Sequence, residues 1–131
     1  MSASLAVQRL VHGALAALPG FAGVFDGPPA DAAPPYLVIG PDAVGEWGTK
    51  TEIGHEHRVA VSLWTDAPGM AAAKALLGPV EAALLALAGA RDGHRVVTCR
   101  LQRSLVIAQP GGWTQGLVEV RVRTVMETGM V

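Results

Sequence analysis

Apolar side chains recur at every second residue in the middle of the chain, where Val59, Val61 and Leu63 alternate with polar or small residues. In an extended chain this spacing places all three side chains on one face. Residues 55–64 are therefore predicted to form a half-buried strand that ends at a tryptophan. Aspartate, proline and glycine at positions 66–69 supply the turn that follows.

The apolar spacing becomes helical after this turn, and we expect a helix over residues 69–87 that lies across the sheet. Gly78 and Pro79 interrupt it. A proline inside a helix removes one backbone donor and costs roughly 3 kcal/mol if nothing compensates. The sequence therefore predicts either a kink there or two abutting helices. The positions expected to face the sheet are Leu76, Leu77, Val80, Leu84 and Leu87, with Lys74 and Glu81 toward water.

Another helix is predicted near the N-terminus, capped by Ser4 and running to about residue 18, where Pro19 and Gly20 end it. Residues 21–25 are expected to form a short strand. Residues 26–35 carry too many prolines for the interior of a sheet, which indicates an ordered surface loop. The apolar stripe of this helix consists of Leu5, Leu10, Val11, Ala14, Leu15 and Leu18.

Residues 36–39 are predicted to form a compact strand that ends at Gly40 and Pro41. Residues 42–54 mix strand formers with glycines, and we interpret them as a long, partly extended hairpin connection. Trp47 has few apolar neighbours in this segment. Two alternatives follow for its ring: it stays exposed until a partner binds, or it packs back on the edge of the sheet.

The last third of the chain is predicted to form a long hairpin around a turn at residues 110–112. Apolar Val97, Cys99 and Leu101 alternate with Thr98, Arg100 and Gln102, and Val118, Val120 and Val122 alternate with Glu119, Arg121 and Arg123. One face of the hairpin should therefore join the core and the other should be polar. The polar face either forms cross-strand charge pairs or is a wall against a neighbouring subunit.

Together these elements indicate an α+β fold: a single antiparallel sheet of about four to five strands, including the long C-terminal hairpin, packed by two helices. The length predicts one domain over residues 1–131. Half of the residues are hydrophobic and 16% are charged, which argues against a disordered protein. The net charge of -1 supplies no excess of cations, so direct nucleic-acid binding is disfavoured. Without a signal peptide or an apolar run of membrane-spanning length, the protein is expected to be soluble in the cytoplasm.

His55 and His57 are the best candidates for chemistry, because on a strand they would point to the same side and could bind zinc. No third ligand follows at a recognisable spacing, so solvated or interface histidines are the simpler interpretation and no metal is expected. Cys99 lies in a strand pattern and should be buried. The sequence has neither a nucleophile elbow nor a phosphate-binding loop. We therefore expect no enzyme, and assign no catalytic residue and no cofactor.

Four short motifs occur in a fixed order: Pro-Tyr at residues 35–36, Glu-His at 56–57, Leu-Trp at 63–64 and Gly-His-Arg at 93–95. With this order and these separations, the chain resembles the small tail-completion proteins of long-tailed phages and phage-like gene-transfer agents. These proteins are also known as tail terminators or head-to-tail joining proteins. The resemblance covers nearly the whole chain. Pro79 departs from it, because the family usually has an unbroken helix there.

The resemblance implies an α+β fold and a structural virion protein. Such a protein forms a ring, typically a hexamer, that caps the tail tube, ends its polymerisation and joins the tail to the neck or head-completion protein at the tail-neck junction. DNA only passes through the lumen, and no membrane partner is implied. The implied interface residues are Trp47, Thr49, Lys50, Glu52 and His55 in a loop toward the tube or a neighbouring subunit, and Arg100, Arg121 and Arg123 on the outer sheet face.

Two other functions stay open on the sequence alone. The chain could be a small soluble metal-binding or ligand-binding α+β domain that uses His55 and His57. It could also be a different part of the same particle, namely a neck stopper or a tail-tube protein.

Overall fold

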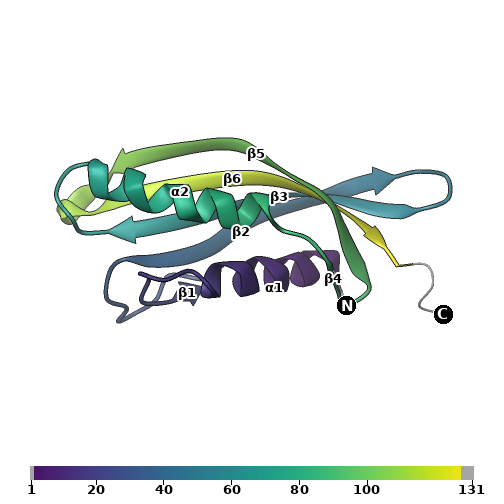
Figure 1. Ribbon diagram of the computed structural model, residues 1–131, viewed down its shortest axis with the longest axis horizontal. Helices are drawn as coiled ribbons and strands as arrows, with labels where there is room; N and C mark the ends of the chain where they lie inside the picture. The colour runs from purple at the N-terminus through teal and green to yellow at the C-terminus, as the bar shows by residue number, and fades with distance from the viewer. Residues whose placement is uncertain (1, 128–131) are drawn as a thin grey trace.

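Two helices lie against one face of a curled six-stranded sheet in the computed structural model, which describes residues 2–127 (Figure 1). The helices are α1 (Ala3–Ala16) and α2 (Ala71–Leu85). The strands are β1 (Val24–Phe25), β2 (Tyr36–Gly48), β3 (Ile53–Thr65), β4 (Ala90–Arg91), β5 (His94–Ala108) and β6 (Thr114–Met126), with a short 3-10 turn at Pro110–Gly112. The predicted α+β class with two helices is confirmed.

The strands follow the order β1-β2-β3-β6-β5-β4 across the sheet. The four long strands pair antiparallel, whereas the two-residue β1 runs parallel to β2. The sheet is therefore mixed and has six strands, not the expected four to five antiparallel ones. The order also places β3 beside β6, so that the two hairpins of the chain are joined through their inner strands.

One face of the sheet, which we call the inner face, carries the hydrophobic core under both helices. The alternation predicted for the central strand is observed, since Val59, Val61 and Leu63 are all buried. Burial of such side chains is the main source of stability. The core also contains Val7, Val11, Leu15, Leu37, Ile39, Leu77, Val80, Leu84, Leu87, Val118, Val120 and Val122. Within residues 2–127, no helix is both long enough and apolar enough to span a membrane.

The N-terminal helix begins earlier than predicted. Ser2 is the N-cap, and its hydroxyl accepts a hydrogen bond from the backbone N–H of Leu5 at 3.2 Å. Ser4 lies within the first turn and donates its hydroxyl proton to Asp42 at 2.7 Å. Leu5, expected in the apolar stripe, is exposed. The buried stripe of α1 consists of Ala3, Ala6, Val7, Val11 and Leu15, which places Leu5 beside it and not within it.

The second helix runs through Pro79 as a single element, so the alternative of two abutting helices is wrong. Pro79 and Ala75, whose carbonyl loses its helical donor, are both exposed. Water can therefore hydrogen-bond that carbonyl. Glu81 does not simply face water as expected, because its carboxylate accepts a 2.6 Å hydrogen bond from the hydroxyl of Ser104 on β5.

The strand predicted to end at Gly40 and Pro41 continues to Gly48. An irregularity between Ile39 and Asp42 absorbs the glycine and the proline, after which pairing with β3 resumes. Most of the undecided segment 42–54 is thus regular hairpin, and only residues 49–52 form its turn.

Two irregularities also alter the face pattern of β5. Val96 pairs with Thr124 and Thr98 with Arg123, so Val97 is an extra residue and is exposed instead of joining the core. A second extra residue, Gln102, lies between the pairs of Leu101 and Arg103. Leu101 stands opposite a buried valine but is itself exposed, because this strand is near the edge of the sheet.

Candidate interaction surfaces

An arm, defined here as residues 44–57, extends past the helices at one end of the molecule (Figure 1). Its β3 strand also pairs with β6 from Gly54 onward, so only the turn and the Gly48–Ile53 pair lie beyond a third strand. The turn is held by Thr49, whose Oγ1 accepts hydrogen bonds from the backbone N–H groups of Thr51 (3.2 Å) and Glu52 (3.1 Å). The Thr49 N–H also donates to the carbonyl of Glu52 at 3.0 Å. Of the predicted loop residues, Thr49 therefore organises the turn, while Lys50 and Glu52 are exposed beside it.

Trp47 packs on the arm itself. It pairs with Gly54 across the hairpin, and its ring occupies the space where a side chain at Gly54 would lie. The guanidinium of Arg123 on β6 lies over the ring, 5.2 Å from its centroid. This distance is within the range of a cation-π interaction. Of the two alternatives left open for Trp47, the structure places the ring back on the sheet, where it is half-buried.

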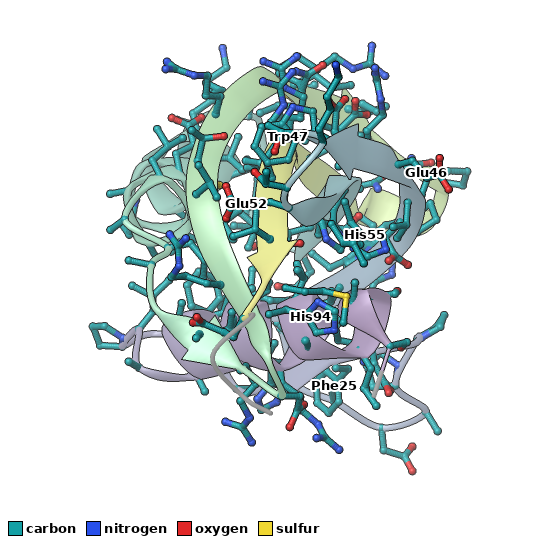
Figure 2. All side chains as sticks on the ribbon, turned by 90° about the vertical axis from the view of Figure 1, so that its right-hand side faces the viewer. Phe25, Glu46, Trp47, Glu52, His55 and His94 are labelled. Carbon is teal, nitrogen blue, oxygen red and sulfur yellow. The ribbon has the colours of Figure 1, made fainter. Side chains whose placement is uncertain are left out.

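The inner face of the arm is different, because no helix covers it. Strand register places Val44, Glu46, Ile53 and His55 on this side. Val44 is 41% exposed and Ile53 is 63% exposed. Figure 2 looks onto this end of the molecule and labels Glu46 and His55 on one side of the arm, with Glu52 beside Trp47. The arm thus presents two large apolar side chains together with carboxylates.

Three arginines form a row across the opposite, outer face of the sheet. Arg58 on β3 stands directly opposite Arg121 on β6, which stands directly opposite Arg100 on β5. We call these three residues the arginine row. Like charges that face each other across strands are destabilising. Within residues 2–127, no carboxylate pairs with Arg100 or Arg121, and Arg58 has only a 3.9 Å contact to Glu56.

Paired charges flank the row on both sides. Arg103 donates two hydrogen bonds to Glu119, both 3.1 Å long, and this partner raises the pKa of the guanidinium. On the other side, the Nε of Arg123 donates to Glu56 at 3.1 Å. The structure therefore brings Arg100 and Arg121 together as predicted, whereas Arg123 is occupied by Glu56 and Trp47.

Sequence reasoning missed Arg58 and Arg103. Arg58 occupies an outward position of the alternating central strand, so its face could have been predicted, but its neighbours depend on the strand order. Arg103 faces Glu119 only because Gln102 is an extra residue.

A row of aromatic rings on the outer face was also not predicted from the sequence. Its rings contact edge to face at centroid distances of 6.0–6.3 Å, in the order Phe25, Tyr36, Trp113 and Trp64.

The predicted histidine pair gains a third member from β5. The His55 ring lies 6.3 Å from His57 and 5.9 Å from His94, a proximity that Figure 2 shows for His55 and His94. His57 is fully buried, and its Nε2 shares a 3.0 Å hydrogen bond with the hydroxyl of Thr124. Burial, together with the neighbouring histidines, lowers the pKa of His57 to about 4, although Asp42 opposes this shift.

The histidine cluster does not form a metal centre in the part of the chain that the structure describes. No group of three histidine, cysteine or carboxylate side chains in residues 2–127 is arranged to hold an ion. A neutral His57 bound to a hydroxyl is a core residue with one satisfied ring nitrogen, whereas its Nδ1 is buried without a hydrogen-bond partner among the described residues. Cys99 is half-buried and not fully buried as expected, and this burial raises the pKa of its thiol to about 11, which disfavours the reactive thiolate.

Comparisons with known proteins agree with the arrangement of these elements. Residues 4–125 match the family described as tail completion protein gp17. A chain in the solved structure "Virion of native gene transfer agent (GTA) particle" is 28% identical to this one. It superposes with a TM-score of 0.83 over 95% of this chain and 98% of that chain. No curated protein sequence matched.

Proposed function

We propose, from the premise that this chain belongs to the tail completion protein gp17 family, that it forms the ring that terminates the tail tube. The family match and the similarity to a gene transfer agent virion make the chain a structural tail protein of a virion or phage-like particle, from a family that is not one of enzymes. The proposal adds a specific role. The ring caps the tube, ends its polymerisation and joins the tail to the neck.

The observation that carries this proposal is that one subunit presents two unlike surfaces. The arm carries exposed apolar groups and carboxylates, while the outer sheet face carries the arginine row, two of whose members have no carboxylate partner within residues 2–127. Two different patches on one chain support head-to-tail contacts, which close into a ring when the rotation allows it. A hexamer is the expected size, and many weak contacts around a ring add up through multivalency.

The proposed partners beyond the ring are the tail-tube protein and a neck or head-completion protein. The tip of the arm, with Thr49, Lys50 and Glu52, is the part that reaches farthest and is proposed to meet the tube or a neighbouring subunit. Trp47 and His55 would act from behind this tip, because both are half-buried. Arg100, Arg121 and Arg123 are proposed to face a protein partner, and the DNA would only pass through the lumen.

Tube capping tests this function directly. Purified protein is added to polymerising tail-tube protein, and tube lengths and ends are measured by electron microscopy. A terminator produces short tubes with one ring at the end, whereas tubes of unchanged length with bare ends would contradict the proposal. A neck stopper would bind the finished cap but leave bare tubes unchanged, and a tube protein would itself be incorporated along the tube.

Substitution at the tip provides the residue-level test. Lys50→Glu reverses the single positive charge of the turn and should weaken capping without lowering thermal stability, because Lys50 is exposed. Lys74→Glu is the matched control, since Lys74 is an exposed lysine on α2. Equal capping by both variants would remove the tip from the proposed interface.

A further inference from the structure

We propose that the arm of one subunit lies across the arginine row of the next, so that each surface is occupied by a second copy of this chain. This inference rests on the proposed function, because it supplies the subunit contact of the ring. The two surfaces differ in chemistry and lie on different parts of the same chain. That is the arrangement which a head-to-tail contact requires.

The arm is built as a surface that needs a cover. The inner face of the arm exposes Val44 and Ile53, and Ile53 is the most exposed of the large hydrophobic side chains described. Exposed apolar groups that lie together mark interaction sites. Glu46 shares this face and Glu52 lies in the turn next to it, and neither carboxylate forms an ion pair within residues 2–127. Their partner must therefore combine apolar surface with positive charge.

The arginine row offers that combination. Its three guanidinium groups are adjacent in register, and two of them have no carboxylate partner in the described chain. An incoming carboxylate would relieve their mutual repulsion and could accept two hydrogen bonds from one guanidinium. Farther along the same face lie half-buried Tyr36, Trp64 and Trp113, and arginine and aromatic side chains are enriched at protein interfaces.

The distribution of charge favours a second copy over another occupant. The chain has ten cationic and eleven acidic residues. Strand register places six of the cations on the outer sheet face, whereas the paired strand positions of that face hold two acids, Glu56 and Glu119. The remainder of the chain is correspondingly acidic. A neighbouring copy thus carries the complementary charge, whereas DNA could occupy the arginine row but would be repelled by the arm.

A charge-swap mixture tests the pairing. The arm variant carries Glu46→Arg and Glu52→Arg, and the face variant carries Arg100→Glu and Arg121→Glu. Each variant alone places like charges in every contact, so the protein concentration needed for ring assembly should rise by more than about tenfold. An equimolar mixture should regain rings of alternating variants, because both of its contacts join opposite charges. Light scattering followed by electron microscopy reports the ring size.

A control variant with Lys74→Glu and Arg91→Glu changes the net charge as much as the face variant does, using exposed cations that belong to neither surface. It should assemble like the wild type. Rings formed by the arm variant or the face variant alone at wild-type concentrations would overturn the inference. Folded variants that fail to assemble when mixed would also overturn it. A third outcome would also overturn the inference: the wild type binds an oligonucleotide, and the face variant loses this binding but still forms rings. That outcome would assign the arginine row to nucleic acid.

Tube capping by the wild type, measured in parallel, separates this inference from the proposed function. Normal capping together with rings that ignore the charge swaps would refute the contact and leave the terminator role intact. Rings that respond to the swaps but never cap a tube would refute the terminator role and leave the contact intact. A wild type that stays monomeric both in solution and on tube ends refutes both.

Discussion

Arg123 joins the arm to the body of the sheet through Trp47, since its guanidinium carbon lies 5.2 Å from the centroid of that ring. The same guanidinium donates to Glu56 at 3.1 Å. One arginine on β6 therefore fixes a ring on β2 and a carboxylate on β3. The arm is thus held to β6 close to its tip, directly behind the turn.

Replacing Trp47 with alanine should loosen the arm while the rest of the protein stays folded. The change removes the ring that lies over Gly54 and the cation-π contact, and should lower the free energy of unfolding by about 1–2 kcal/mol. Hydrogen exchange measured by mass spectrometry should show faster exchange for residues 44–57 than in the wild type. Trp47→Phe, which keeps a ring, is the control, and unchanged exchange in Trp47→Ala would contradict the proposed anchor.

Protonation of His57 should destabilise the protein in mild acid. Its pKa is lowered to about 4 in the folded protein, so the unfolded chain binds a proton first as the pH falls below its ordinary value of 6.5. The contribution of neutral His57 to the free energy of unfolding is complete above pH 6.5 and is lost between pH 6.5 and about 4. The loss between pH 7 and pH 5 should be about 1–2 kcal/mol. Urea unfolding at a series of pH values measures this loss.

The matched variant is His57→Gln, whose amide can still hydrogen-bond Thr124 but does not titrate. Its stability should depend less on pH over the same range than that of the wild type. An identical pH dependence in both proteins would assign the acid sensitivity to other groups. Direct NMR titration of the His57 ring provides a second check, with no protonation expected above about pH 5 in the folded protein.

Local patterns predicted the core strand and both helices, because alternation and helical spacing depend only on neighbouring residues. Extra residues are harder to predict. Val97 and Gln102 each shift the facing pattern of β5, and nothing in the local sequence distinguishes them from paired residues. The continuation of β2 past Gly40 and Pro41 was missed for the same reason, since an irregularity absorbs both residues.

The candidate surfaces depend on strand order, which local patterns do not contain. Arg58, Arg100 and Arg121 lie far apart along the chain and meet only because β6 inserts between β3 and β5. His94 reaches His55 through the same topology. The net charge of -1 likewise gives no indication that several arginines lie on one face of the sheet. Interface residues could therefore be named by type from the sequence, but their grouping could not.

Two glycines of the arm should respond in opposite ways to substitution by alanine. A Cβ at Gly54 would overlap the carbonyl oxygen of Trp47 and lie 3.0 Å from the carbonyl oxygen of Thr124, so Gly54→Ala should lower the free energy of unfolding by about 1–3 kcal/mol. Gly45 has nothing within 4 Å of such a Cβ, and Gly45→Ala should be neutral or stabilise by up to about 1 kcal/mol. Chemical denaturation compares them, and similar stabilities would contradict the close packing at Gly54.

Adjacent leucines on α2 provide a test of which helix face packs on the sheet. Leu84 is 0% exposed within the core and Leu85 is 45% exposed. Leu84→Ala should lower the free energy of unfolding by about 2–5 kcal/mol, because it removes buried methyl groups and leaves a cavity. Leu85→Ala should change it by less than about 0.5 kcal/mol, because alanine is also a good helix former and the side chain is on the surface. Equal losses measured by urea unfolding would mean that α2 is rotated about its axis, and a larger loss for Leu85→Ala would place the opposite face of the helix against the sheet.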